Sequence, residues 1–115
     1  MQASPPEELV ALVTPVLEEV VFSKQQVAKE IEIHYNTVTT WDTIAFFRVP
    51  HYRKCYEISL GKYNRRQPLV KYQVWVLKRI KYLFGRLRHT DRVRTYLTTY
   101  AHEFTFQAFQ QEKQL

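Results

Sequence analysis

The chain has 115 residues, 45% of them hydrophobic and 15% aromatic, and its 17 Lys and Arg against 11 Asp and Glu give a formal net charge of +6. This length and composition fit one small domain with a hydrophobic core and exclude an intrinsically disordered chain. The single cysteine, Cys55, excludes an intramolecular disulfide framework and a cysteine zinc cluster, and the apolar stretches are too short to span a membrane.

The charge is distributed unevenly along the chain. Residues 1–22 contain four Glu and no Lys or Arg, whereas residues 48–94 contain fourteen Lys and Arg against Glu57 and Asp91. A segment this basic favours a polyanionic partner, and nucleic acid is the commonest one. An anionic membrane surface or an acidic protein would also satisfy the charge.

The first 22 residues are predicted to form an acidic, helical N-terminal extension. Ser4, Pro5 and Glu7 stand where an N-cap, a first helical residue and a first-turn acid are expected. The apolar residues that follow are too many for a free surface helix, so we expect the segment to pack on its own domain or on a partner chain.

Residues 23–41, SKQQVAKEIEIHYNTVTTW, carry the most informative pattern of the chain. Ser23 followed by Gln26 three residues later predicts a capping box at the start of a helix that runs to about Ile31. A second helix is predicted from about Tyr35 to Ala45. The inward-facing positions of the pair are Val27, Ala28, Ile31, Ile33, Val38 and Trp41.

This apolar spacing resembles the helix-turn-helix superfamily, whose second helix enters the DNA major groove. One departure is Glu32, which stands where the superfamily usually has a glycine in a left-handed turn conformation. The alternative interpretation is two ordinary amphipathic helices joined by a short loop.

The outward face of the second predicted helix is polar and uncharged between His34 and Trp41. Asparagine can pair in a bidentate way with adenine, and threonine can offer its methyl to thymine and its hydroxyl to a base or phosphate. Base reading is therefore expected from Tyr35, Asn36, Thr39, Thr40 and Thr43.

Residues 51–64 show a rough alternation of apolar and polar residues and are predicted to form a β-hairpin wing. Basic residues on such a wing would straddle the DNA backbone beside the groove. Together with residues around the helix-turn-helix, the expected phosphate contacts are Ser23, Lys24, His34, Arg53, Lys54, Lys62, Arg65, Arg66 and Lys71.

A long amphipathic helix is predicted from Pro68 to about Phe84, ended by Gly85. A further helix is expected to begin at Thr90 or Asp91, with a strand as the alternative, and residues 104–108 alternate as a short strand would. A basic cluster in the same region could also bind phosphate: Arg86, Arg88, His89, Arg92 and Arg94.

Over about residues 22–84, the predicted order of elements is similar to that of the MerR-type winged helix-turn-helix regulators. The elements are a helix-turn-helix, a basic wing and a long helix that opens with PLVKYQVWVLKRIKYLF. The resemblance implies a mainly α fold with a small β wing, and DNA binding as a dimer. The implied division is an N-terminal extension (1–22), a winged helix-turn-helix domain (23–84) and a C-terminal dimerisation segment (85–115). The family's long coiled coil, effector domain and metal-sensing cysteines are missing, so effector sensing is not implied. The chain is also compatible with the small MerR-like repressors that accompany CRISPR-associated transposons of the type V-K class.

These patterns predict a sequence-specific, dimeric DNA-binding transcriptional regulator, most simply a repressor that occludes a promoter. The expected partners are double-stranded operator DNA and a second copy of the chain, in a bacterial cytoplasm. We expect no cofactor, metal, membrane or small-molecule ligand. We also expect no enzymatic activity, because the chain contains no Gly-rich phosphate loop, HExxH or GxSxG motif.

Three alternatives stay open at this stage. An adaptor or inhibitor could use the basic surface to bind an acidic protein. An RNA-binding protein could stack unpaired bases on Tyr52, Tyr56, Tyr63 and Trp75. A DNA strand-transfer enzyme could use a tyrosine nucleophile with arginine clamps from the cluster of Arg92, Arg94, Tyr96, Tyr100 and His102, although the chain is short for one.

Overall fold

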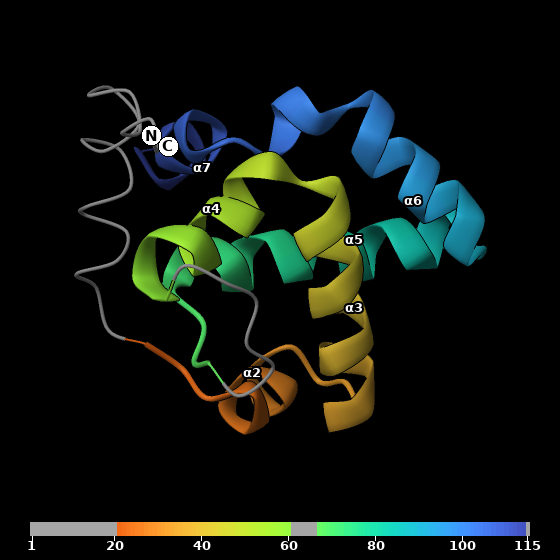
Figure 1. Ribbon diagram of the computed structural model, residues 1–115. Coiled ribbons are helices and arrows are strands. Elements are labelled where there is room, and N and C mark those ends of the chain that lie inside the picture. Colours follow the sequence, from red (N-terminus) through yellow and green to blue (C-terminus); the bar gives the residue numbers. More distant parts are fainter. Residues whose placement is uncertain (1–20, 61–66, 115) are drawn as a thin grey trace.

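The structure, a computed structural model, describes residues 21–60 and 67–114 (Figure 1). Over these two ranges the chain forms helices and no strand, with one isolated backbone bridge between Phe22 and Leu69. The elements are α2 (Lys24–Glu30), α3 (Tyr35–Arg48), α4 (Pro50–Leu60), α5 (Lys71–Leu87), α6 (Thr90–Thr99), the 3₁₀ turn η1 (Ala101–Phe104) and α7 (Phe106–Gln114). In Figure 1, α3 and α4 cross in front of α5, α2 lies below, and α6 and α7 lie above. Residues 1–20 of the predicted N-terminal extension lie outside the described part of the chain.

The two helices of the predicted helix-turn-helix are confirmed, and so is the capping box that begins the first. The Ser23 hydroxyl accepts a hydrogen bond from the Gln26 backbone N–H at 3.1 Å, and the Ser23 N–H donates to the Gln26 side chain at 2.8 Å. The turn between the helices passes through Glu32, whose φ of 58° is left-handed. His34 caps α3, because its Nδ1 accepts from the Asn36 N–H at 3.0 Å. Glutamate thus occupies the strained turn position that glycine usually fills.

The predicted β wing is wrong, and with it the winged helix-turn-helix fold class. Residues 51–60 belong to α4, which begins at Pro50, a residue suited to the first turn of a helix. The alternation that indicated a strand was ambiguous, because Tyr52 and Tyr56 are also spaced by one helical turn. Both are fully buried together with Cys55, as one face of a helix requires. Residues 61–64 of the predicted wing lie outside the described part of the chain.

The C-terminal region also differs from expectation. The predicted strand at residues 104–108 is wrong, because η1 ends at Phe104 and α7 begins at Phe106. The helical alternative for residues 90–99 is confirmed as α6. The long helix is confirmed as α5, but it runs through Gly85 and ends at Leu87, with Arg88 as its left-handed cap at a φ of 60°. Glycine often ends a helix, but here Phe84 and Leu87 pack against the core on either side of Gly85, and the helix continues through it.

All of the described helices share one hydrophobic core. Trp41 of α3 stacks on Phe84 of α5, with ring centroids 5.1 Å apart. The C-terminal segment contributes to the same core through Val93, Leu97, Phe104, Phe106 and Phe109. These apolar side chains, which the sequence offered as a dimer interface, are buried within the chain.

Candidate nucleic-acid interface

The outward face of α3 forms an open groove of about 630 Å³, which we call the α3 groove. It contains all five residues predicted to read bases, brought together as expected from their helical spacing. Asn36 and Thr40 are exposed, and Thr39 and Thr43 are half-buried. Two further residues complete its lining, Ile44 of α3 and Arg94 of α6. The groove is therefore polar, has no acidic residue in its lining, and is flanked by one cation.

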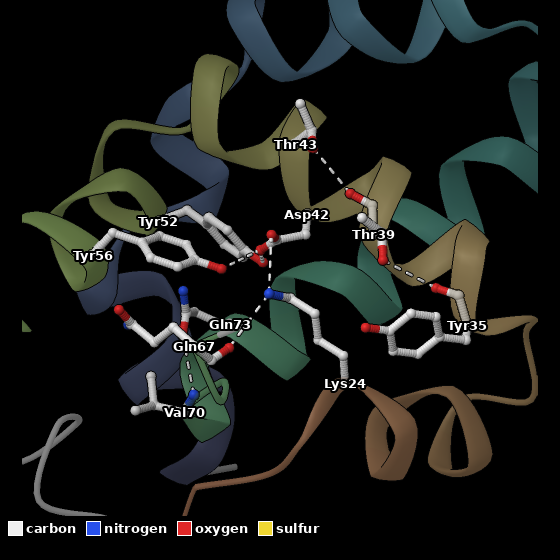
Figure 2. Close-up of polar contacts among 10 residues, drawn as sticks. All are labelled: Lys24, Tyr35, Thr39, Asp42, Thr43, Tyr52, Tyr56, Gln67, Val70 and Gln73. Carbon is white, nitrogen blue, oxygen red and sulfur yellow. Dashed lines mark hydrogen bonds and ion pairs between the residues drawn. The ribbon is translucent and has the colours of Figure 1, made fainter. Parts of the chain in front are cut away.

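The threonine hydroxyls of the α3 groove are oriented by the helix backbone. Thr39, Thr40 and Thr43 donate to the carbonyl oxygens four residues earlier, at 3.3, 3.0 and 3.0 Å. Figure 2 shows two of these bonds running along α3. Because the hydroxyl protons are directed to the backbone, the threonine side chains present hydroxyl lone pairs and methyl groups to the groove. Exocyclic amino groups of adenine or cytosine and the methyl of thymine match those features in the major groove.

The inward face of α3 carries a buried polar cluster of Lys24, Asp42, Tyr52 and Tyr56 (Figure 2). Asp42 is fully buried, and one of its oxygens accepts from the hydroxyls of Tyr52 and of Tyr56, the latter at 2.6 Å. Its other oxygen lies 3.6 Å from the Lys24 ammonium. Burial, followed by the charge of Asp42, raises the pKa of Tyr52 well above its usual value, so this phenol keeps its proton and donates. The cluster fixes the rotation of α3, because Asp42 satisfies its charge only when it faces α2 and α4.

This arrangement removes Lys24 from the set of phosphate-binding candidates. The residue is only 5% exposed, and its ammonium also donates to the carbonyl of Gln67 at 3.3 Å. A lysine directly after an N-cap looks like a surface residue in the sequence. Nothing local indicates a carboxylate partner 18 positions later.

The other predicted phosphate contacts are scattered. His34 adjoins the α3 groove because it caps α3, and Ser23 is exposed but already engaged in the capping box. Arg53 donates to the Phe46 carbonyl at 3.3 Å from α4, and Lys54 lies half-buried on the same helix. Lys71 lines a separate, mainly apolar pocket between α2, α5 and α7. The remaining three, Lys62, Arg65 and Arg66, lie outside the described residues.

Two arginines lie at α3: Arg94, which the sequence placed in a separate basic cluster that could bind phosphate, and Arg48, which was not predicted as a contact. Arg94 lines the α3 groove from α6, and its guanidinium lies 3.5 Å from the Asp91 carboxylate. Arg48, the last residue of α3, donates to the Thr98 hydroxyl of α6 at 3.3 Å. The basic cluster around residues 86–94 was visible in the sequence, but the packing of α6 beside α3 was not.

The RNA-binding alternative loses two of its four proposed stacking residues. Tyr52 and Tyr56 are fully buried, and Tyr63 lies outside the described residues. Trp75 packs against Phe109 at 5.5 Å, and its indole N–H donates to Glu112 at 2.7 Å. Tyr52 and Tyr56 are therefore committed to the protein interior, and Trp75 is half-buried against the core.

The strand-transfer alternative gains no support from Tyr96. Its hydroxyl donates to Glu103 at 2.7 Å, and this hydrogen bond, with some burial, raises the pKa of Tyr96. A raised pKa lowers the fraction of phenolate, the form that attacks phosphorus. Within the described ranges, no group of His, Cys, Asp and Glu side chains is arranged to hold a metal ion, and no helix there is long and apolar enough to cross a membrane.

Comparisons with protein-family models, with curated protein sequences and with solved structures gave no match. The wing, one of the features behind the resemblance to MerR-type regulators, is helix α4 over residues 51–60. A relation to that family stays a prediction.

Proposed function

We propose that the protein binds double-stranded DNA with sequence selectivity and reads bases in the major groove through α3. The observation that carries this proposal is the α3 groove, in which α3 presents a row of uncharged hydrogen-bonding side chains. The opposite face of α3 is held in the core by the buried Asp42. A merely solvated helix face usually carries Lys, Arg or Glu. Here those residue types are absent from the outward face, while the whole chain has a formal charge of +6.

Among the described helices, α6 packs at the C-terminal end of α3, so we assign the N-terminal end of α3 as the one that leads into the DNA groove. The hydrogen bond from Arg48 to Thr98 places α6 beside the C-terminal end of α3, as Figure 1 also shows. The N-terminal turns, with Tyr35 and Asn36, point away from that contact. Helix-turn-helix proteins place the first residues of their second helix against the base edges. We therefore assign the base contacts mainly to the first two turns of α3.

A dimeric regulator is the form of this function that the size of α3 favours. One reading helix covers only a few base pairs, so affinity and selectivity usually come from two half-sites bound by two copies. A small protein of this kind represses transcription most simply, because occupying a promoter requires no further domain.

The test is a salt titration of duplex binding combined with the substitution Asn36→Ala. For some 5 to 9 phosphate contacts, the log of the binding constant should fall with the log of salt concentration with a slope of about −4 to −8. Asn36→Ala should remove the preference for a selected sequence and leave nonspecific binding intact. The control is Gln107→Ala, an exposed substitution on α7, which should change neither property.

Two results would count against the proposal. A salt slope near zero would exclude the phosphate contacts that DNA binding requires. An unchanged sequence preference in Asn36→Ala would remove α3 from the role of reading helix.

A further inference from the structure

Arg94 is held at the edge of the α3 groove by an interaction that a phosphate could replace. Among the described residues, the Arg94 guanidinium pairs with the Asp91 carboxylate, one turn earlier on α6, at 3.5 Å. The Arg94 side chain is 45% exposed and that of Asp91 is 92% exposed. Exposed pairs of this kind contribute little, because water screens them. A phosphodiester offers the guanidinium two oxygens in the geometry that arginine binds best.

Helix α6 carries a second arginine that faces elsewhere. Residues two apart on a helix lie about 200° apart around its axis. Accordingly, Arg92 lines a shallow depression on the other side of α6 with Leu87 and Tyr100, and takes no part in the α3 groove. The two arginines therefore carry the same charge and lie on the same helix, but only Arg94 lines the α3 groove.

The packing of α6 against α3 restricts where α6 can lie on a duplex. A major groove about 12 Å wide admits one helix, whose diameter with side chains is about 10 to 12 Å. Helix α6 packs beside α3, and the Arg48 guanidinium donates to the Thr98 hydroxyl across this contact at 3.3 Å. When α3 enters the groove, α6 has to stay outside it, against the sugar-phosphate strand that borders the groove.

We propose that Arg94 binds a backbone phosphate bordering the bases read by α3, and so fixes the register of α3 along the groove. This inference rests on the proposed DNA binding. The role assigned to the predicted wing, contact with the backbone beside the reading helix, then belongs to α6. The ligand is a phosphodiester of duplex DNA, recognised by its charge and shape and not by its sequence.

The experiment compares Arg94→Gln with Arg92→Gln on the full chain. Binding of each variant to a selected duplex and to an unrelated duplex is measured over a range of salt concentrations. Arg94→Gln should weaken binding to both duplexes by about tenfold and reduce the magnitude of the salt slope by about one. Arg92→Gln should leave the slope as it is in the wild-type protein. Both side chains are exposed, so far-UV circular dichroism and the urea midpoint should match the wild type.

A third variant, Arg94→Lys, separates charge from shape. It should keep the wild-type salt slope, because the cation remains, but recover only part of the lost affinity, because lysine cannot bind a phosphate through a fork of two N–H groups.

The outcomes distinguish this inference from the function on which it rests. If the wild-type protein binds duplex DNA and the two Gln variants lose affinity equally, α6 acts only as diffuse positive charge and the proposal for Arg94 is overturned. A wild-type slope in Arg94→Gln overturns it as well, again with DNA binding intact. If the wild-type protein binds no duplex at low salt, the proposed function fails and Arg94 loses its role with it.

Discussion

The buried ion pair between Lys24 and Asp42 joins the start of α2 to the middle of α3. Replacing Lys24 with Met keeps most of the side chain's length and its apolar stem, but removes the ammonium. Asp42, whose exposed fraction is 0%, then loses the ammonium that lies 3.6 Å from its carboxylate. We expect Lys24→Met to lower the free energy of unfolding strongly.

The magnitude follows from the separation of the charges. At 3.6 Å and an effective dielectric constant of about 20, the attraction is about 4 to 5 kcal/mol. Breaking a buried pair by removing one partner costs about 3 to 5 kcal/mol in proteins. Because the methionine side chain packs well in the vacated space, we expect a net loss of about 3 kcal/mol. This is a large part of the roughly 5 to 15 kcal/mol that stabilises a typical domain.

The assay is urea unfolding followed by circular dichroism, with Lys78→Met as the matched control. Lys78 pairs with Glu30 at a similar distance, 3.8 Å, but the two side chains are 52% and 65% exposed. That surface pair should contribute less than about 1 kcal/mol. Equal losses in the two variants would refute the reasoning, because burial would then have no effect. Where Lys24→Met is still folded, its salt slope for DNA should equal that of the wild type, since Lys24 contacts no phosphate in this account.

Two further predictions concern stability. Glu32→Gly should raise the free energy of unfolding by about 0.5 to 1 kcal/mol, because glycine adopts the φ of 58° without steric cost. The control, Lys29→Gly inside α2, should lower the free energy of unfolding by about 1 kcal/mol. A loss of stability in both variants would contradict the strain at Glu32. Burial lowers the pKa of His51 below 6.5, and its Nδ1 accepts from the Phe106 N–H at 2.9 Å. The stability from this neutral histidine should be fully present above pH 6.5 and be lost as pH falls toward the lowered pKa. Urea midpoints between about pH 8 and pH 5 should show this decline, His51→Gln should reduce it, and an equal decline in that variant would assign it to other groups.

The pair of helices α2 and α3 was predictable because its signals are local. The capping box of Ser23 and Gln26 and the spacing of Val27, Val38 and Trp41 involve residues within a few turns of each other. The polar outward face followed from the same periodicity. The structure adds a reason for its orientation, because Asp42 fixes the opposite face in the core.

The errors arose where local patterns were ambiguous or where distant residues decide. Tyr52 and Tyr56 fit both a strand and a helix, and the shared contact with Asp42 places them on a helix. Gly85 marks the end of a helix in sequence, yet α5 continues to Leu87. The position of Arg94 beside α3 depends on long-range packing of α6, which no short pattern encodes.

The proposed function is tested most directly by incubating the purified protein with random duplex DNA and sequencing the bound fragments. We expect an enriched motif, with two related half-sites if two copies bind, and loss of the enrichment in Asn36→Ala. Binding without any enriched motif would contradict base reading by α3. Failure to retain any duplex at low salt would contradict DNA binding altogether and favour an acidic protein as the partner of the basic surface.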